Sequence, residues 1–457
     1  MPLCKRLIIA FMISVTPLLS YAAGFSIHEQ STKGLGRALS GSSAVADDAS
    51  TIYFNPAGLT QLEKNEFVLG SNFLFSDSSF QNNGSTGPTI LGSPPLSGET
   101  ENINFFVNNA GSYAFIPNLY YAHRLSQELV AGIGITAPFG LATDYDEDWI
   151  GRYHALHSSL SGININPSIG FKWNEQLSIG FGISAQYSEI ELSNAIDFAS
   201  LCLFESLSNP ALYAGCAGQS DPSRDGIITM KASDLGWGYN VGLIYQLTEM
   251  TRLGLSYRSK ISHNFKGQAS FELPNNVQNT PLAASFSNQN LFGSLELPEN
   301  ISFSTVHKNG KWQYTSDITW TRWSRFQKLQ INSADPSSPV NSNTPYNWKD
   351  NFRIAIGADY QVNHSLSVRT GLAYDASPVP EQTRGARIPG EDRYWFSLGA
   401  SYQITPAWQV DAAYVHVKIK DPVISQTLNT FPLDHQINGR YTVDIDILSL
   451  QLRWQFD

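Results

Sequence analysis

The sequence has little charge and no long apolar run. Of its 457 residues, 68 are charged (29 Lys and Arg, 39 Asp and Glu), which is 15 %, whereas soluble domains usually carry about 25 %. A membrane-spanning helix needs about 20 apolar residues in succession. The longest apolar stretch, Leu7–Leu19, is shorter than this. The sequence therefore excludes a helical membrane protein and is unusually poor in charge for a soluble one.

The net charge, the missing motifs and the aromatic content exclude further classes of protein. The formal net charge of −10 argues against a nucleic-acid-binding protein, which would be basic. The sequence shows no glycine-rich phosphate loop after a strand, no Cys/His metal cluster and no nucleophile elbow, so we expect no enzyme, cofactor or metal site. Aromatic residues are plentiful (10 Trp, 20 Tyr and 25 Phe), which argues against a disordered chain. Together with 35 glycines, these numbers favour a transmembrane β-barrel, which has an apolar lipid face and a polar interior.

The first 22 residues have the pattern of a secretory signal peptide. Lys5 and Arg6 form a positive n-region, Leu7–Leu19 forms the apolar h-region, and Ser20–Ala22 provides small residues for cleavage before residue 23. A short N-terminal anchor is the alternative. Residues 1–22 are therefore predicted to direct export.

Two cysteines, Cys202 and Cys216, remain after removal of this segment. An even number of cysteines in an exported chain favours a disulfide, which would restrain a loop here. Two free thiols are the alternative, and a metal site lacks a third ligand nearby.

Polar and apolar residues alternate over long segments of the chain. Near the C-terminus Leu448, Leu450, Leu452 and Trp454 are separated by single polar residues, which is the period of a strand with two different faces. A membrane-spanning barrel strand needs about 9 to 11 residues. Fourteen such segments lie near 66–75, 112–123, 128–137, 161–173, 176–190, 232–247, 251–265, 290–307, 311–330, 348–362, 365–377, 392–404, 407–418 and 441–456.

The connections between these segments alternate between six short turns and seven long loops. Outer-membrane barrels have an even number of strands, short periplasmic turns and long external loops. Because sheet edges cannot be exposed to lipid, the first and last strands should pair. We therefore predict an all-β fold over residues 66–457, a fourteen-stranded antiparallel transmembrane β-barrel in the outer membrane of a Gram-negative type of cell.

The segment before the first strand, residues 23–65, shows no sustained alternation. Gly34, Gly36, Gly41 and Pro56 interrupt regular structure in it. Its small residues and modest charge favour packing inside the lumen as an N-terminal hatch, for which a fourteen-stranded barrel has room.

Short motifs also follow one another in a characteristic order. They are Ala23-Gly24-Phe25, Gly34-Leu35-Gly36-Arg37-Ala38, Ala46-Asp47-Asp48-Ala49, Asn55-Pro56-Ala57, Tyr257-Arg258-Ser259, Phe265-Lys266-Gly267, Trp323-Ser324-Arg325-Phe326-Gln327, Asn351-Phe352-Arg353-Ile354-Ala355-Ile356-Gly357, Asp375-Ala376-Ser377-Pro378-Val379-Pro380 and Asp392-Arg393-Tyr394-Trp395. With this ordered set the sequence resembles the FadL/TodX family of outer-membrane transporters over the whole mature chain.

The resemblance implies a barrel with a hatch that carries long-chain fatty acids or other hydrophobic compounds inward without ATP. In that family the ligand is caught in an apolar groove among the outer loops and then enters a pocket beside the mature N-terminus. A shift of that N-terminus opens a path to a gap in the barrel wall at a kinked strand, and the ligand leaves sideways into the bilayer. The implied partners are hydrophobic small molecules and outer-membrane lipid, with no cofactor and no nucleic acid, and the implied state is a monomer.

The resemblance also implies site residues. Phe25 matches a ligand-contacting phenylalanine, with simple packing in the hatch as the alternative. Asn55, Pro56 and Ala57 match a gating motif expected beside the wall opening, with a turn into the first strand as the alternative. Pro56 fixes its own φ and favours an extended Asn55.

A fatty-acid carboxylate needs a basic partner, because a buried unpaired charge is costly. The fatty-acid branch of the family has a lysine where this chain has Gln330. Lys328 lies on the same strand face by the period of two and is the candidate ligand-binding substitute. The branch also has an arginine where this chain has Glu189, two residues after Tyr187, and a carboxylate there would repel an anion. These departures leave neutral aromatic hydrocarbons or alkanes as alternative substrates. Separately, a general diffusion porin is a further alternative function.

Three more charged residues lie in a matched region. Asp375, Arg384 and Arg393 are candidates for a charge network in the lumen that seats the hatch, with solvated charges as the alternative. The chain ends with Asp457 after Phe456, whereas such barrels tend to end in an aromatic residue, so the assembly signal departs from the usual one.

Overall fold

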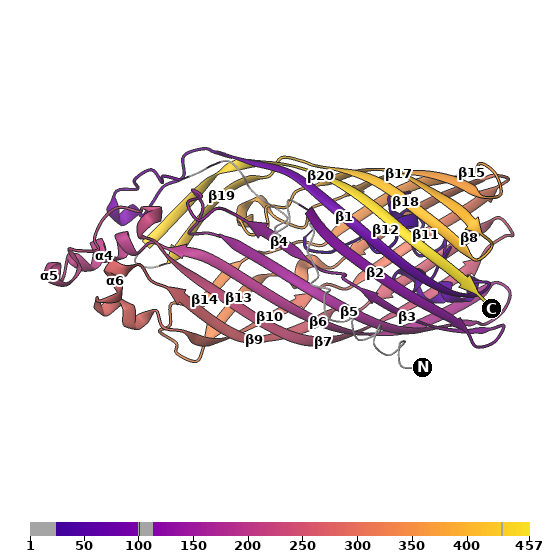
Figure 1. The fold of residues 1–457 in the computed structure, drawn as a ribbon, viewed down its shortest axis with the longest axis horizontal. Helices are drawn as coiled ribbons and strands as arrows, with labels where there is room; N and C mark the ends of the chain where they lie inside the picture. The colour runs from indigo at the N-terminus through magenta and orange to yellow at the C-terminus, as the bar shows by residue number, and fades with distance from the viewer. Residues whose placement is uncertain (1–23, 99, 101–112, 431–432) are drawn as a thin grey trace.

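The computed structural model describes residues 24–98, 100, 113–430 and 433–457, and the predicted signal peptide lies outside them. Figure 1 shows tilted strands that run along the long axis of the molecule and enclose an interior. The helices α4, α5 and α6 gather at one end, and the C-terminus lies at the other. Within the described ranges, the helices are too short or too polar to cross a membrane.

Twenty strand segments form one antiparallel sheet. They are β1 (Asn65–Asn82), β2 (Tyr113–Arg124), β3 (Leu129–Thr136), β4 (Leu141–Asp144), β5 (His157–Lys172), β6 (Leu177–Ile196), β7 (Gly226–Gln246), β8 (Thr251–Arg258), β9 (Ile261–Glu272), β10 (Gln289–Leu297), β11 (Asn300–Asn309), β12 (Trp312–Thr321), β13 (Lys328–Ser333), β14 (Ser342–Pro345), β15 (Asn351–Gln361), β16 (Leu366–Asp375), β17 (Arg393–Thr405), β18 (Trp408–Ile419), β19 (Val423–Thr430) and β20 (Leu433–Phe456). The sheet closes because β20 pairs with β1, from Asn65 opposite Phe456 to Asn82 opposite Gly439.

Six strands of the barrel are each divided into two segments. The pairs are β3 with β4, β8 with β9, β10 with β11, β12 with β13, β14 with β15, and β18 with β19. The two segments of each pair lie beside the same neighbour in the sheet. Where that neighbour is itself divided, each segment pairs with one of its two parts. The twenty segments are therefore fourteen strands, and the predicted closed barrel is confirmed.

The interruptions themselves differ from expectation. The alternation predicts continuous strands over 251–265, 290–307 and 311–330, whereas each of these regions is broken, and it does not predict β4, β14 or β19. Pro138, Pro298 and Pro422 lie in three of the breaks. A proline has no N–H to donate to a ladder, so pairing is interrupted there. The alternation of buried and exposed side chains stops as well, because residues 136–141 and 297–299 are all buried.

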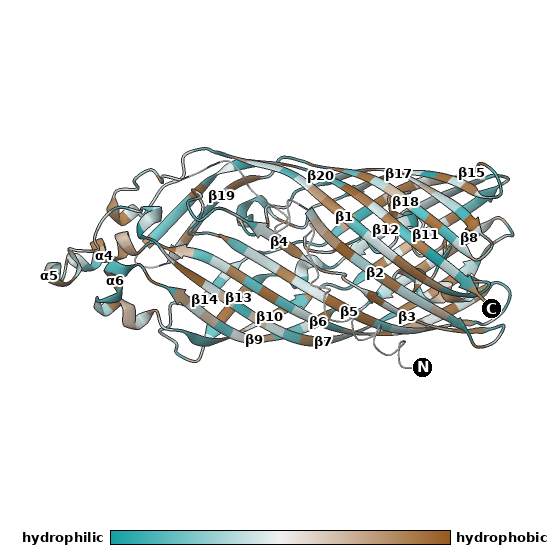
Figure 2. Cartoon of the chain, viewed as in Figure 1, coloured by the Kyte–Doolittle hydropathy of each residue, from teal (hydrophilic) through white to brown (hydrophobic). Residues whose placement is uncertain are grey.

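The two faces of the barrel wall differ in polarity. On β17, Tyr394, Phe396 and Leu398 point outward and are 43–60 % exposed, while Arg393 and Trp395 point inward and are 1 % exposed. Figure 2 shows apolar and polar residues alternating along the strands. An apolar outer face is what contact with lipid requires.

The other described elements are short. They are α2 (Thr32–Leu35), α3 (Thr51–Phe54), α4 (Phe198–Ser206), α5 (Pro210–Tyr213) and α6 (Asn275–Gln278), with the 3-10 helices η1 (Pro56–Gln61), η2 (Thr89–Leu91), η3 (Pro222–Arg224), η4 (Pro281–Ser285), η5 (Trp323–Arg325) and η6 (Glu381–Thr383). The helix α2 begins after Ser31, whose Oγ accepts a hydrogen bond from the N–H of Gly34 at 3.1 Å.

Residues 24–62, here called the N-terminal segment, contact several parts of the inner wall. The hydroxyl of Thr32 lies 2.6 Å from that of Ser449 on β20, and the hydroxyl of Ser40 lies 2.6 Å from that of Thr315 on β12. Nearly all side chains between these contacts are buried. The segment thus fills the lumen near the short turns, and β1 begins directly after it.

Candidate functional site

Five aromatic side chains meet at Phe25, close to the start of the N-terminal segment. The ring centroid of Phe25 lies 4.7 Å from that of Trp323, 5.5 Å from Trp348, 5.6 Å from Phe326 and 6.3 Å from Phe139. All five residues are buried. We call these residues the aromatic cluster. Their rings present a large apolar surface without a charge.

The aromatic cluster is assembled at three of the strand interruptions. Phe139 lies between β3 and β4, Trp323 and Phe326 lie between β12 and β13, and Trp348 lies between β14 and β15. In a continuous strand, residues an odd number of positions apart face opposite sides. The break lets Trp323 and Phe326 both turn inward, so the interruptions create the cluster.

The backbone of the N-terminal segment pairs with the interrupted third strand. Ser26 forms an antiparallel bridge with Phe139, flanked by hydrogen bonds from the N–H of Ile27 to Pro138 O and from the N–H of Gly140 to Phe25 O, both 2.9 Å. Gly24 precedes this bridge with φ of 67°, and a Cβ there would lie 2.6 Å from a ring carbon of Trp323. Only glycine fits this conformation and this approach.

The pairing of the wall is incomplete at the same place. The ladder between β2 and β3 ends with Leu119 opposite Ile135, and among the described residues β4 pairs with β5 alone. The ladder with β3 covers β2 only from Leu119 to Arg124. Residues 113–118 of β2 therefore have no ladder partner on the side that faces β4. The bridge at Ser26 covers the inner side of this interruption.

The Asn55-Pro56-Ala57 motif lies against a different part of the wall. The Nδ2 of Asn55 donates to Ser43 O at 2.7 Å and to Leu243 O on β7 at 3.0 Å, and its Oδ1 accepts from the N–H of Ala57 at 3.0 Å. The gating role of the motif stays a prediction, but the structure places the motif on strands that are paired with one another.

Three glycines make room for this motif. Gly170 on β5 faces Gly180 on β6, which faces Gly242 on β7. A Cβ on Gly180 would overlap the backbone N of Ala57, and one on Gly242 would overlap the side chain of Asn55. The row without side chains thus lets the backbone of the N-terminal segment lie directly on the wall.

A narrow apolar cavity lies on the inner face of the barrel wall, in the half of the barrel near the outer loops. It has a volume of about 30 Å³ and is lined by Ile190, Leu192, Met230, Phe265, Leu329 and Ile331, among others. A cavity of this size holds about one water molecule. A long hydrophobic ligand would have to displace these side chains to enter.

Lys328 does not face this cavity. Leu329 and Ile331 line it, so the period of two turns Lys328 and Gln330 to the opposite face of β13, where Lys328 is exposed. The two residues share a face as expected, but that face is the outer one. Glu189 and Tyr187 are also exposed on the outer face of β6, so Glu189 does not confront an anion in the lumen.

Two of the three charged candidates lie together. Asp375 and Arg393 are directly opposite each other on β16 and β17, are both 1 % exposed, and Asp375 lies 3.6 Å from the Nε2 of His28. Arg384 pairs instead with Glu391 at 2.6 Å, in the loop between those strands. The charges therefore belong to two separate sets.

Sequence reasoning missed Arg387 in the same loop. Its guanidinium donates to His157 O at 3.1 Å, to Ser158 Oγ at 3.0 Å and to Asn194 Oδ1 at 3.0 Å. Among the described residues it has no carboxylate partner. These bonds tie the loop across to β5 and β6, and no local pattern in the sequence marks the residue.

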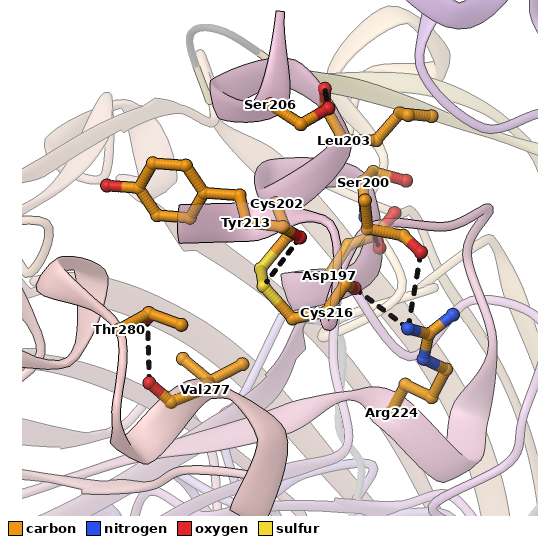
Figure 3. The surroundings of a disulfide bond; sticks show 11 residues. Asp197, Ser200, Cys202, Leu203, Ser206, Tyr213, Cys216, Arg224, Val277 and Thr280 are labelled. Atoms are coloured by element: carbon orange, nitrogen blue, oxygen red, sulfur yellow. Dashed lines mark hydrogen bonds between the residues drawn. A yellow bond between two sulfur atoms is a disulfide. The ribbon is translucent and has the colours of Figure 1, made fainter. Parts of the chain in front are cut away.

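The outer loops are held by the disulfide between Cys202 and Cys216 (Figure 3). The bridge packs with Phe198, Tyr213 and Val277. Because Val277 belongs to α6, the disulfide supports the contact between the loop after β6 and the loop after β9. The Nη2 of Arg224 donates to Cys216 O at 2.9 Å on the other side (Figure 3).

Two buried ionisable groups lie beside this loop. Burial and the nearby His435 lower the pKa of His154 to about 3. Burial would raise the pKa of Asp197, but hydrogen bonds from His435 at 3.0 Å and from Ser220 at 2.5 Å outweigh it and hold that pKa below its ordinary value. The folded outer loops therefore favour a neutral His154 and an ionised Asp197.

Comparison with known proteins agrees with this architecture. The family described as outer membrane protein transport protein (OMPP1/FadL/TodX) matches residues 13–456. The long-chain fatty acid transport protein of Salmonella typhi is 31 % identical over 426 residues, which cover 90 % of this chain and 92 % of that protein. Outer membrane protein P1 of Haemophilus influenzae is 29 % identical over 411 residues, with 87 % and 86 % covered.

Solved structures share the fold. A Pseudomonas aeruginosa FadL homologue superposes with a TM-score of 0.81 at 25 % identity, over 95 % of this chain and 100 % of that chain. The Ralstonia pickettii toluene transporter TbuX has a TM-score of 0.64 at 19 % identity, over 95 % and 99 %, and supports the fold alone. The chain belongs to the OMPP1/FadL/TodX family of outer-membrane transport proteins.

Proposed function

We propose that this protein carries hydrophobic molecules, in the first place long-chain fatty acids, passively from the outer surface into the outer membrane. The observation that supports this most strongly is the position of the N-terminal segment, whose backbone covers the interrupted third strand while Phe25 joins the aromatic cluster. One movement of the segment would therefore change both an apolar binding surface and a lateral path.

The physical chemistry suits such a ligand. Each CH2 group buried against apolar side chains gains about 0.8 kcal/mol, so a long acyl chain binds a surface like the aromatic cluster without specific polar contacts. The barrier to uptake is the polar outer leaflet rather than the hydrocarbon. Release through the gap between β2 and β4 would leave the ligand in lipid, where it is more soluble than in water.

In this proposal Phe25 contacts the ligand, and residues 23–65 act as the hatch. Asn55, Pro56 and Ala57 anchor the hatch on the glycine row rather than lining the exit. Asp375 and Arg393 with His28 seat its first residues. The protein acts as a monomer without a catalytic step, because one barrel contains the complete path.

Neutral aromatic hydrocarbons are the second candidate substrates. Lys328 points away from the lumen and the aromatic cluster carries no charge, so the inner surface offers more to a neutral ring than to a carboxylate. Arg387 is half-buried and has no carboxylate partner among the described residues, so it is the candidate cation for a fatty-acid carboxylate. Opposite effects of Arg387→Gln on the uptake of the two substrates would separate them.

The experiment compares uptake of a labelled long-chain fatty acid and of toluene in cells with and without the protein. We expect uptake of at least one of them to rise when the protein is present. No change for either class would refute the proposal. Conductance of ions and sugars in planar bilayers checks the diffusion-porin alternative, which requires an open lumen.

A further inference from the structure

We propose that a polar cavity below the N-terminal segment binds a small multivalent oxyanion, a molecule with several carboxylates or a phosphate. The cavity has a volume of about 510 Å³ and lies at the end of the barrel with the short turns. Those turns face the periplasm in outer-membrane barrels. This site is separate from the aromatic cluster and does not depend on which hydrophobe the protein carries.

The cavity lies between the N-terminal segment and the wall. Lys33 and Asp47 come from the segment, while Lys311, Asp359 and Arg369 come from the wall and from the turn before β12. A ligand there would contact both parts at once.

The lining is strongly basic in an otherwise acidic chain. Five cations line the cavity, Lys33, Lys308, Lys311, Arg369 and Arg453, against the two carboxylates of Asp47 and Asp359. The formal charge of the whole chain is −10. Among the lining side chains themselves, basic residues thus outnumber acidic ones.

The two carboxylates are already engaged by another residue. Arg37, which is buried and does not line the cavity, holds both Asp47 and Asp359 at 3.0 Å. Three further carboxylates lie nearby on the inner side: Asp48 is 3.6 Å from Lys33 Nζ, Glu66 is 3.8 Å from Arg453 Nη1, and buried Asp411 accepts hydrogen bonds from Ser401, Gln409 and Gln451. The cations that stay only partly neutralised are therefore Lys308, Lys311 and Arg369.

Arg369 provides a buried donor set. It is 7 % exposed, and its Nη2 donates to Ser401 Oγ at 2.6 Å. Its Nε and Nη1 have no hydrogen-bond partner, and the nearest carboxylate oxygen, of Asp359, is 3.7 Å from Nε. Buried guanidinium N–H groups without acceptors are costly, and a carboxylate or phosphate would satisfy them with a fork-like pair of bonds.

Two lysines complete the site on the open side. Lys308 is exposed and forms no ion pair with the described residues, and Lys311 donates only to Val362 O at 3.1 Å. Both flank the turn that joins β11 to β12. A multivalent anion could bind Arg369 with one oxygen group and these lysines with another, which a monovalent anion could not.

The anion would hold the N-terminal segment against the wall. Lys33 belongs to the segment, and Arg369 belongs to β16, so a bound anion links them. A ligand that binds only the closed arrangement stabilises it by mass action. Occupancy of the cavity would therefore make release of the segment less frequent.

The test uses the full-length protein in detergent at low ionic strength, with citrate and inorganic phosphate as probes and acetate as the monovalent comparison. Isothermal titration calorimetry should give saturable binding of citrate or phosphate with one site per chain, and much weaker binding of acetate. Arg369→Gln should weaken the binding by about tenfold or more, the effect of losing a charge-assisted hydrogen-bonded group. Rising salt should weaken it further.

The matched control is Lys172→Gln. Lys172 is the last residue of β5, beside a short turn at the same end. It pairs with Glu175 at 2.7 Å and is outside the cavity, so the substitution should leave the affinity unchanged. If Arg369→Gln does not fold, as judged by the gel mobility of the unheated barrel, the double variant Lys308→Gln/Lys311→Gln decides, because both side chains are exposed.

Hydrogen exchange gives a second readout. Citrate should slow amide exchange in residues 33–47 of the wild type and not of the double variant. Absence of saturable citrate and phosphate binding in the wild type would overturn the proposal, and so would equal weakening by Lys172→Gln. Neither result bears on uptake of hydrophobic substrates.

Discussion

Ile27 donates its backbone N–H to the carbonyl oxygen of Pro138 at 2.9 Å, which places the start of the N-terminal segment directly on the interrupted third strand. Pro138 cannot donate in return, so the pairing is limited to the single bridge between Ser26 and Phe139 and its two flanking hydrogen bonds. The contact therefore rests on two backbone hydrogen bonds, each worth about 0.5–1.5 kcal/mol net.

Replacement of Phe25 by alanine should weaken ligand binding and leave the barrel folded. The substitution removes the central ring of the aromatic cluster, whereas the barrel ladder contains no bond to this side chain. Affinity for a labelled fatty acid in detergent measures the effect, and Phe396→Ala on the outer face is the control. Unchanged affinity in Phe25→Ala would show that the ring only packs.

The row of glycines should be intolerant of side chains. Gly180→Ala places a Cβ on the backbone of Ala57, so we expect displacement of the N-terminal segment and a loss of about 1–3 kcal/mol, as for overpacking in a core. Thermal unfolding and bilayer conductance measure the two effects.

The control for this substitution is Gly293→Ala, where the nearest atom to the new Cβ is Gln330 O at 3.3 Å. It should change stability and conductance little. A Gly180→Ala protein as stable and as closed as the wild type would mean that the segment does not rest on this row.

Reduction of the disulfide should loosen the outer loops alone. Closing a loop of 14 residues between Cys202 and Cys216 is worth about 3 kcal/mol in the chain-entropy account. We expect faster proteolysis within residues 197–225 after reduction or in Cys202→Ser/Cys216→Ser, with an unchanged barrel mobility on gels. Equal cleavage rates before and after reduction would argue against a stabilising role.

Acid should destabilise the outer loops through His154. This side chain takes a proton near pH 6.5 in the unfolded chain but only near pH 3 when folded, so its contribution is present above about pH 6.5 and is lost as the pH falls toward 3. Asp197, whose folded pKa is lowered, adds a loss below about pH 4.

Hydrogen exchange of residues 145–156 between pH 7 and pH 4, corrected for intrinsic rates, measures this change. His154→Gln should remove most of the dependence above pH 4 while Asp197 remains ionised. Protection that is constant from pH 7 to pH 4 in the wild type would contradict the assignment.

The sequence predicts the barrel well because alternation and turn length are local properties. It does not predict the interruptions, since the apolar period of two in the sequence runs on through Pro298, from Leu295 and Leu297 to Ile301 and Phe303, although the first two are buried and the last two are exposed. The outward orientation of Lys328 could have been predicted from the period of two. Tyr314 and Ile318 are outward positions of β12, and Lys328 lies an even number of residues further along the segment 311–330 that the alternation predicts as one strand.

Contacts between distant residues could not be predicted. Nothing near Ser26 or Phe139 in the chain indicates that they pair, and the position of Arg387 depends on a long loop that crosses to β5 and β6. Resemblance located Phe25, but only the structure shows that its partners come from three separate breaks in the wall.

A disulfide between position 26 and position 139 tests whether uptake requires the N-terminal segment to leave the interrupted third strand. The two residues form a narrow antiparallel pair, whose Cα atoms typically lie about 4.5 Å apart and suit a disulfide. We expect that Ser26→Cys/Phe139→Cys blocks uptake of a hydrophobic substrate under oxidising conditions. On reduction it should regain the uptake of the Phe139→Cys single variant, which lacks one ring of the aromatic cluster. Uptake at the wild-type rate by the fully cross-linked protein would contradict that requirement.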